Sequence, residues 1–311
     1  MGAIRRLRKH HFDENSEDSG SDWDVITKPT FFTKKTVVPN EKSGIMDFFP
    51  DLKFKKKKVA LVLSGGGAKG MAHVGLIREL EKYDVDVDFI SGTSMGAIIG
   101  AIYALEKDLA LVDKYLKHTV KDFVRLKDFN FSLKGLIKGM VIEDLLWSIY
   151  GNAKFEDAKI NFVVNAVDLE NGREVVFNEG RILDAVRASM SLPVIFTPKT
   201  IDGRRYVDGG VINNVPYSHV PKNYKKVIVC DVNHYFPSLK KNHSGIEYFY
   251  HVISLLEHNA TRIPDDKRII LVRPDMTNIM VGDFAKSKEA VYRGSQEAKK
   301  VLPNYFKKIK D

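Results

Sequence analysis

The pattern of hydrophobic and polar positions changes at about residue 59. Upstream, residues of both charges mix with Ser, Asn, Pro and scattered aromatics, and neither a two-residue nor a 3.6-residue period is sustained. Downstream, short uniformly apolar runs alternate with segments of helical periodicity. Such runs are typical of parallel strands covered by helices on both faces. The pattern predicts a poorly ordered arm over residues 1–54. It predicts an α/β domain over residues 55–311, a three-layer sandwich with a mainly parallel central sheet.

The first two predicted strands, 59–63 and 87–90, each lead through a glycine-containing turn into a helix. The first helix spans about Gly70 to Lys82, and the second is rich in small residues from Ala97 to Ala104. Two alternating strands, 161–168 and 173–177, flank an Asn-Gly pair that suits a hairpin turn. Further strands are expected at 226–232 and 268–273, and helices at about 180–190, 247–261 and 286–300.

The segment from about 121 to 151 is apolar without a clear strand pattern. Its aromatic residues include Phe129, Phe131 and Trp147. One interpretation is a cap or lid over an apolar site that touches lipid. The other is an ordinary helical excursion packed on the core. The sequence does not separate the two.

Composition favours a reducing compartment. The single cysteine, Cys230, excludes an internal disulfide framework, and its apolar setting predicts a buried thiol in an interior strand. The basic start is followed by no apolar stretch, and no run of eighteen apolar residues occurs. We therefore expect a cytoplasmic protein without a spanning helix.

The net charge of +9 favours anionic partners. Lys53 and the run Lys55–Lys58 form the sharpest basic cluster. This cluster suits peripheral contact with an anionic membrane surface, but a solvated charge run that protects the following apolar strand is the stronger interpretation. No nucleic-acid partner is expected.

Two glycine-rich turns carry the candidate chemistry. Gly65-Gly66-Gly67-Ala68-Lys69-Gly70 follows the first strand, and Gly92-Thr93-Ser94-Met95-Gly96 follows the second. Successive glycines can aim backbone N–H groups into one concavity, as an oxyanion hole requires. A serine between two glycines at a strand-to-helix turn is typical of a nucleophile elbow. The pair predicts hydrolysis of acyl esters, with Ser94 as the nucleophile. The predicted oxyanion-hole residues are Gly65, Gly66, Gly67 and Met95, and the predicted supporting residues are Lys69, Gly70, Gly92 and Gly96.

The first turn also fits a dinucleotide-binding fingerprint, because its glycine spacing follows a strand and opens a helix. That fingerprint expects an acidic residue at the end of the second strand, where this chain has Ser91-Gly92-Thr93-Ser94. A P-loop is excluded, since no Lys-Ser or Lys-Thr follows the glycines. A nucleotide- or anionic-lipid-binding module without catalysis stays open as an alternative. Lys69 either anchors a phosphate headgroup or packs at the helix start, and we favour packing.

The general base is less obvious, because none of the nine histidines lies in a catalytic motif. Asp208, followed by Gly209 and Gly210, ends a short strand and can reach a neighbouring turn. A carboxylate can serve as the base if burial raises its pKa. A Ser-Asp-His triad also remains open, because five histidines follow Asp208 in the chain: His219, His234, His243, His251 and His258.

Taken together, these residues resemble the patatin-like phospholipase family. The resemblance rests on four blocks in the family's order: the glycine turn 65–70, Gly92–Gly96, Ala188-Ser189-Met190-Ser191-Leu192-Pro193, and Asp208-Gly209-Gly210. It covers residues 58–230 firmly and the remainder to about 303 loosely.

The resemblance implies a patatin-like fold and a Ser94–Asp208 dyad that needs no histidine, metal or other cofactor. It further implies that the glycine turn is the oxyanion hole and that Gly209 and Gly210 support the motif. The implied substrates are acyl esters of phospholipids or related lipids.

Overall fold

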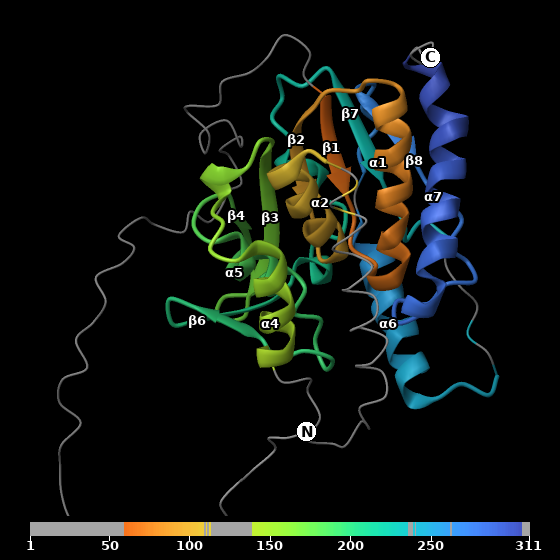
Figure 1. Ribbon diagram of the computed structural model, residues 1–311. Coiled ribbons are helices and arrows are strands. Elements are labelled where there is room, and N and C mark those ends of the chain that lie inside the picture. Colours follow the sequence, from red (N-terminus) through yellow and green to blue (C-terminus); the bar gives the residue numbers. More distant parts are fainter. Residues whose placement is uncertain are drawn as a thin grey trace, which may run out of the picture. The chain divides into compact units, whose positions relative to one another are not determined.

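The computed structural model describes residues 59–108, 110, 112, 139–235, 239, 241–261 and 263–306. The predicted arm, the lysine cluster and residues 121–138 of the predicted cap lie outside these ranges. Within them the chain forms a mixed α/β structure around one sheet (Figure 1). The predicted α/β class with a mainly parallel central sheet is confirmed.

The described strands are β1 Val59–Leu63, β2 Val87–Gly92, β3 Asn161–Asp168, β4 Arg173–Phe177, β5 Lys199–Ile201, β6 Arg204–Asp208, β7 Lys226–Cys230 and β8 Ile269–Val272. Their order in the sheet is β5-β6-β3-β2-β1-β7-β8, and β4 pairs with β3. The five strands from β3 to β8 in that order run parallel, whereas β4, β5 and β6 add antiparallel pairs at one side. β5 and β6 are the strands for which no range was predicted.

The described α-helices are α1 Ala72–Lys82, α2 Met95–Glu106, α4 Gly139–Tyr150, α5 Ile182–Ser189, α6 Gly245–Ala260 and α7 Ser287–Val301. Short 3₁₀ helices are η2 Gly67–Met71, η3 Phe155–Asp157, η4 Gly209–Val211, η5 Tyr217–His219, η6 Phe284–Lys286 and η7 Leu302–Asn304. Among the described residues, none of the helices is both long and apolar enough to cross a bilayer.

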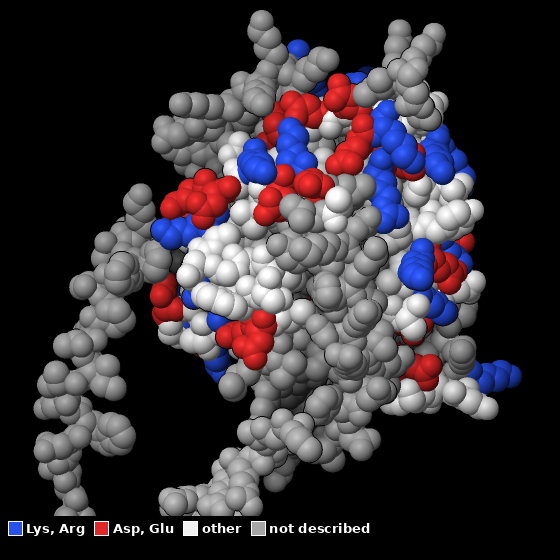
Figure 2. Space-filling view, in the orientation of Figure 1, with Lys and Arg blue, Asp and Glu red and all other residues white. Residues whose placement is uncertain are grey.

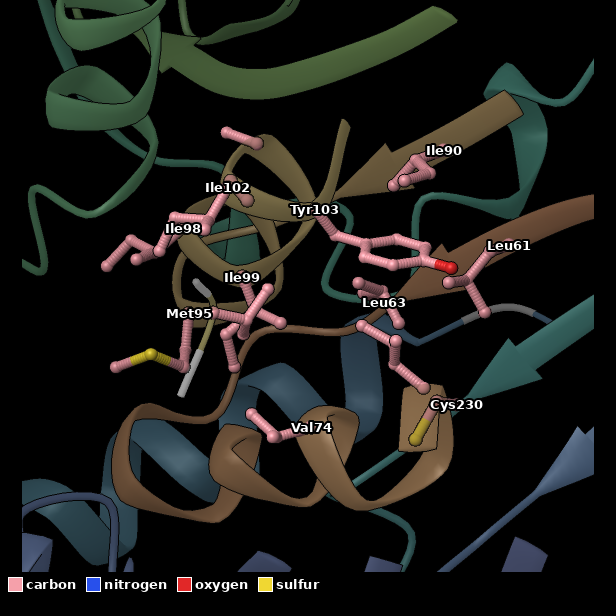
Figure 3. Packing of buried hydrophobic residues seen from close by; sticks show 14 of the residues in the cluster. Leu61, Leu63, Val74, Ile90, Met95, Ile98, Ile99, Ile102, Tyr103 and Cys230 are labelled. Carbon is pink, nitrogen blue, oxygen red and sulfur yellow. The ribbon is translucent and has the colours of Figure 1, made fainter. Parts of the chain in front are cut away.

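The main core lies between the sheet and α1, α2, α5 and α7. Side chains of α1 and α2, among them Val74 and Ile99, meet Leu61 and Leu63 of β1 (Figure 3). Cys230 of β7 is fully buried in the same cluster, as predicted, and burial raises the pKa of its thiol. Burial of these apolar side chains is the dominant stabilising contribution, at roughly 25 cal/mol per Å².

The opposite face of the sheet has a smaller core. Ala60 and Val62, which alternate with Leu61 and Leu63 along β1, contact it from the strand side. In the described chain, the segment from Val215 to Tyr224 covers this face rather than a long helix. β1 is therefore buried on both faces, which explains its uniformly apolar sequence.

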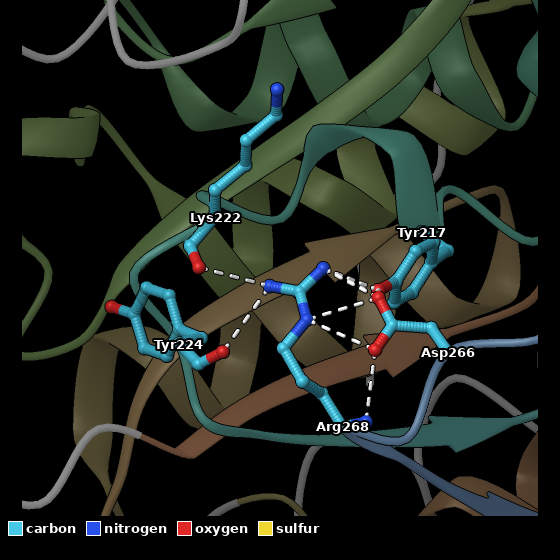
Figure 4. Close-up of polar contacts among 5 residues, drawn as sticks. All are labelled: Tyr217, Lys222, Tyr224, Asp266 and Arg268. Carbon is cyan, nitrogen blue, oxygen red and sulfur yellow. Dashed lines mark hydrogen bonds and ion pairs between the residues drawn. The ribbon is translucent and has the colours of Figure 1, made fainter.

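Arg268, beside the start of β8, fastens that covering segment (Figure 4). Its guanidinium donates to the Asp266 carboxylate at 2.7 Å and to the hydroxyl of Tyr217 at 2.7 Å. It also donates to the carbonyls of Lys222 and Tyr224, at 3.1 and 3.2 Å. The planar fork of arginine suits several acceptors at once, so one side chain holds the chain that follows Asn214 against the sheet.

Charged side chains of both signs are interspersed on the face shown in Figure 2. The described residues in that view form no large single-sign patch. The excess positive charge of the whole chain therefore does not gather on this part of the described surface.

The cap segment is described only at its C-terminal part. There, α4 packs on α5 and buries Ile142 and Leu146, while Trp147 remains exposed. Phe129 and Phe131, on which the cap interpretation depends, lie outside the described residues.

Candidate active site

Ser94 lies on a strained turn between β2 and α2. Its φ of 52° and ψ of −117° fall where a residue with a side chain is rarely found. Such a conformation costs about 1–3 kcal/mol and requires support from its surroundings. The Ser94 N–H donates to the hydroxyl of Ser189 at 2.8 Å, which supplies part of that support. Ser94 itself stays partly exposed, so its hydroxyl can meet a substrate.

The flanking glycines allow α2 to begin very close to the end of β1. A Cβ on Gly96 would lie 2.2 Å from the carbonyl oxygen of Leu63, and one on Gly92 would lie 2.7 Å from that of Gly96. Both distances are too short for any side chain. The predicted supporting role of these two glycines thus has a steric basis.

The register of β3 brings the end of β2 to the end of β6. Val164 pairs with Gly92 of β2, and Ala166 pairs with Asp208 of β6. Both β3 residues also pair with β4, which occupies the other edge of β3. β2 and β6 therefore share one edge and meet end to end, two residues or roughly 7 Å apart along β3.

Asp208 is buried beside the serine, with 1 % of its surface exposed. Its Oδ1 accepts the Gly210 N–H at 2.8 Å. Burial raises the pKa of Asp208 to about 6, and the nearby Ser94 side chain and the Gly210 N–H oppose that rise. The carboxylate is thus a stronger base than an exposed aspartate.

The third block of the family resemblance, residues 188–193, contacts the backbone of both Ser94 and Asp208. Ser189, at the end of α5, accepts the Ser94 N–H, and the carbonyl of Ser191 accepts the Asp208 N–H at 3.1 Å. The buried Arg187 donates to the Ser191 hydroxyl at 2.6 Å and to the Thr197 carbonyl at 3.0 Å. Arg187 therefore orders the loop on which Asp208 depends.

The glycine turn passes directly beside Ser94. A Cβ on Gly65 would lie 3.4 Å from the Cβ of Ser94 and 2.4 Å from Oδ1 of Asn214, so only glycine fits there. Gly66 and Gly67 have φ values of 148° and 53°, which favour glycine. A Cβ on Gly70 would lie 2.6 Å from Cγ of Met95, so this glycine brings η2 against α2.

The N–H groups of the four predicted oxyanion-hole residues are not equivalent. The N–H of Gly65 donates to the carbonyl of Asn214 at 3.1 Å and is already engaged. Within the described chain, no acceptor is found for the N–H groups of Gly66, Gly67 and Met95. Of the four, these three are the N–H groups without a partner in the described chain.

Lys69 is buried rather than turned to solvent. Its side chain is 1 % exposed, and its ammonium donates to Oδ1 of Asn233 at 3.1 Å. Burial lowers the pKa of Lys69 to about 8, although the charges of Glu257 and Asp231 oppose this. The packing interpretation fits this setting, because a buried ammonium presents no surface to a headgroup.

Sequence reasoning missed three polar residues around the pair. Asn214 is fully buried between Gly65 and Gly210, and neither atom of its amide finds a partner among the described residues. Asn233 and Glu257 form a hydrogen bond of 3.0 Å behind the glycine turn. Burial raises the pKa of Glu257 to about 8, and the charge of Asp208 raises it further. Asn233 follows a parallel strand at the edge where ligands bind, which was the available signal.

The histidines that follow Asp208 contact other groups. His219 lies 3.1 Å from Glu174, and Nδ1 of His258 lies 3.1 Å from the carbonyl of Asn233. Within the described chain, no histidine is hydrogen-bonded to Ser94 or Asp208. His73 is fully buried, and burial lowers its pKa to about 4.

Comparison with known families matches this arrangement to one of them. The sequence profile of the patatin-like phospholipase family matches residues 61–220, more than half of the chain. The chain belongs to the patatin-like phospholipase family. The matched range, 61–220, includes the glycine turn, Ser94, the block around Ser189 and Asp208.

Two relatives show how far the similarity extends. The chain is 30% identical over 207 residues to lysophospholipase NTE1 of Candida albicans, which covers 63% of this chain and 15% of that protein. It is 33% identical over 163 residues to an uncharacterized NTE family protein of Mycobacterium bovis, covering 52% and 45%. The chain thus spans less than half the length of either relative.

Solved structures to which the chain shows some similarity include VipD from Legionella pneumophila and the type III effector ExoU. The first has a TM-score of 0.47 at 13% identity and covers 81% of this chain and 68% of VipD. The second has a TM-score of 0.40 at 15% identity and covers 80% and 53%.

Proposed function

We propose that this chain is a lipid acyl hydrolase that cleaves carboxylic esters through Ser94 and Asp208. The carrying observation is a partly exposed serine on a strained turn, close enough to a buried carboxylate to influence the raised pKa of that carboxylate. Membership of the patatin-like phospholipase family supports lipid hydrolysis. The lysophospholipase name of the Candida relative favours phospholipids or lysophospholipids as substrates.

In the proposed reaction, Oγ of Ser94 attacks the ester carbonyl carbon while Asp208 accepts the hydroxyl proton. The resulting oxyanion is held by the N–H groups of Gly66, Gly67 and Met95. Gly65 is left out of this set because its N–H is engaged by Asn214. When the intermediate collapses, Asp208 returns the proton to the leaving alkoxide and an acyl-enzyme forms.

The second half of the reaction releases the fatty acid. Asp208 accepts a proton from water, and the hydroxide attacks the acyl-enzyme carbonyl. Collapse of the second intermediate breaks the bond to Oγ, which takes the proton back from Asp208. No histidine takes part in the scheme.

Exposed apolar side chains near the pair suit an acyl chain. Val211 and Ile212, three and four residues after Asp208, are 44% and 39% exposed. Val194, three residues after Ser191, is 56% exposed. Three to four residues of chain reach at most about 10–14 Å, so Val211 and Ile212 lie within that distance of Asp208, which a fatty acyl group can span.

Fluorophosphonate labelling combined with hydrolysis of lysophosphatidylcholine tests the proposal. Only an activated serine displaces fluoride to form an Oγ–P bond, so Ser94 should be labelled. Ser94→Ala and Asp208→Asn should each lower kcat by on the order of 10³ or more, as for members of one catalytic unit. Ser148→Ala, on the exposed side of α4, is the matched control and should react like the unchanged protein.

Other results would favour the alternatives. Absence of labelling at Ser94 in the folded protein favours a nucleotide- or anionic-lipid-binding module. A loss of about 10³ on replacing His219, His234, His243, His251 or His258 by Ala points to a histidine base. The Ser94–Asp208 scheme tolerates all five replacements.

The proposal extends to a cap over residues 121–151 and to peripheral contact with an anionic membrane. Polar replacement of Phe129 and Phe131 should then lower activity on aggregated lipid more than on a soluble short-chain ester. Equal loss on both substrates would argue against the cap.

A further inference from the structure

Asn233 lies behind the glycine turn, three residues beyond the end of β7. β7 pairs with β1 in parallel, so the segment after β7 lies beside the turn that follows β1. Asn233 is 2 % exposed, and both hydrogens of its amide have acceptors. Nδ2 donates to the carbonyl of Gly65 at 3.2 Å and to Oε2 of Glu257 at 3.0 Å.

The orientation of this amide is fixed by its neighbours. Its Oδ1 accepts from the Lys69 ammonium at 3.1 Å. A flipped amide would place Nδ2 against that ammonium and Oδ1 against the carbonyl of Gly65. Asn233 can therefore present only its NH₂ group to Gly65.

The two peptide units on either side of Gly65 are held in different ways. In the unit 64–65, Nε2 of His73 donates to the carbonyl of Ser64 at 2.8 Å, and the Gly65 N–H donates to Asn214. Both ends of that unit are occupied. In the unit 65–66, Asn233 holds the carbonyl, while the Gly66 N–H has no acceptor in the described chain.

The second unit joins two glycines and lies beside Ser94. Glycines on both sides leave its rotation less restricted than in any other pair of residues. A rotation of the unit would exchange the N–H for a carbonyl oxygen, which repels a developing oxyanion. In a trans peptide the N–H and C=O point in opposite directions. Holding the Gly65 carbonyl at Asn233 therefore turns the Gly66 N–H away from Asn233.

We propose that Asn233 is a positioning residue for the oxyanion hole, because its hydrogen bond to the Gly65 carbonyl keeps the Gly66 N–H directed at the substrate oxygen. The proposal rests on the hydrolase function proposed above. Asn233 acts through the backbone and does not touch the substrate.

A pair of substrates that differ only in the carbonyl atom tests this role. In the transition state, p-nitrophenyl butyrate develops negative charge on its carbonyl oxygen, whereas its thiono analogue develops the charge on sulfur. The carbon–sulfur bond is longer, and sulfur accepts hydrogen bonds weakly. The oxygen ester therefore depends more strongly on the hole. The ratio of kcat for the two esters reports the alignment of the hole and not the stability of the fold.

Two variants of Asn233 break the contact. Asn233→Leu removes all polar contacts of the side chain, and Asn233→Asp keeps an acceptor for Lys69 but cannot donate to Gly65. Each should lower kcat for the oxygen ester by on the order of 10², as does loss of one oxyanion donor. KM for both esters and kcat for the thionoester should change little. The ratio of kcat for the oxygen ester to kcat for the thionoester should therefore fall. Cooperative urea unfolding verifies that each variant is folded, and Asn233→Asp serves if Asn233→Leu is not.

Lys69→Met is the matched control, because it removes the other contact of the same amide and leaves the Gly65 carbonyl held. It should reduce stability yet preserve the ratio of the two esters. An equal loss on both esters in the Asn233 variants, or no loss, would overturn the positioning role. A kcat ratio near one for the two esters in the unchanged protein would overturn it as well, because the oxygen ester would then not depend on the oxyanion hole. Absence of Ser94-dependent hydrolysis in the unchanged protein would instead remove the proposed function itself, and the positioning role with it.

Discussion

Asp208→Asn should stabilise the protein at neutral pH while it abolishes activity. Burial disfavours the charged carboxylate of Asp208 and raises its pKa from 3.8 to about 6. Asparagine has nearly the same shape and is neutral at every pH. Its Oδ1 can still accept the Gly210 N–H that Asp208 accepts at 2.8 Å. The substitution thus removes a buried charge without creating a cavity.

The size of the effect follows from the shift. A rise of about two pKa units corresponds to about 3 kcal/mol of unfolding free energy. For a carboxyl group whose pKa is raised by folding, the stabilising contribution is complete below the unfolded pKa and is lost as pH rises through the folded pKa. The two proteins should therefore differ little in this respect at pH 4. The variant should be about 3 kcal/mol more stable at pH 8.

Urea unfolding from pH 4 to pH 8 measures this difference. Asp202→Asn is the matched control, because Asp202 is exposed in the turn between β5 and β6 at a φ of 49°, which Asn also tolerates. Its stability should stay within about 0.5 kcal/mol of the unchanged protein. If Asp208→Asn were no more stable at pH 8 than at pH 4, relative to the unchanged protein, the charge of Asp208 would not be strained by burial.

Three further outcomes follow from the site. The value of kcat/KM for a soluble ester should rise with pH through about 6, because Asp208 must be ionised to accept a proton; a limb near 4 would point to an unshifted carboxylate. Ser189→Ala should reduce stability in urea by about 1–3 kcal/mol and lower kcat, because the N–H of the nucleophile loses its 2.8 Å acceptor; unchanged values would show that water replaces the hydroxyl. Gly96→Ala should displace α2 from β1 and lower kcat by about 10² or more, since the new Cβ would meet a carbonyl oxygen at 2.2 Å. Gly100→Ala, whose Cβ would meet only two side-chain methyls, at 3.0 and 3.5 Å, is its control and should retain most of the activity.

The sequence was most informative where strands are buried or turns are short. The hairpin strands 161–168 and 173–177 match β3 and β4 to the residue, because alternation and Asn171-Gly172 fix both strands and turn. No range was predicted for β5 and β6, because Lys199–Ile201 and Arg204–Asp208 are short and partly polar. Antiparallel pairing at the side of the sheet stabilises such strands without an apolar run.

The residues of the candidate site also fall into those that the sequence indicates and those that it does not. Ser94, Asp208 and the glycine turn could be predicted because each lies in a short motif with unusual residues. Asn233 had only its place after a parallel strand as a signal. Glu257 had none, because a polar residue that becomes buried through tertiary contacts leaves no local pattern. The Gly65 N–H was predicted as an oxyanion donor, yet its partner, the carbonyl of Asn214, lies about 150 residues away in the chain. Only the folded arrangement distinguishes it from the N–H of Gly66.

Each strained part of the site is held by a residue from another segment. The φ of Ser94 is supported by Ser189 of α5, and the backbone N–H of Asp208 is held by the carbonyl of Ser191 after α5. The peptide unit between Gly65 and Gly66, whose rotation its glycines restrict little, is held by the side chain of Asn233 after β7. Because these supports anchor on elements packed against the sheet, the strain is carried by the sheet and not by the loops alone. Removing one support should therefore lower the reaction rate by misplacing one group, while the core around β1 keeps the protein folded.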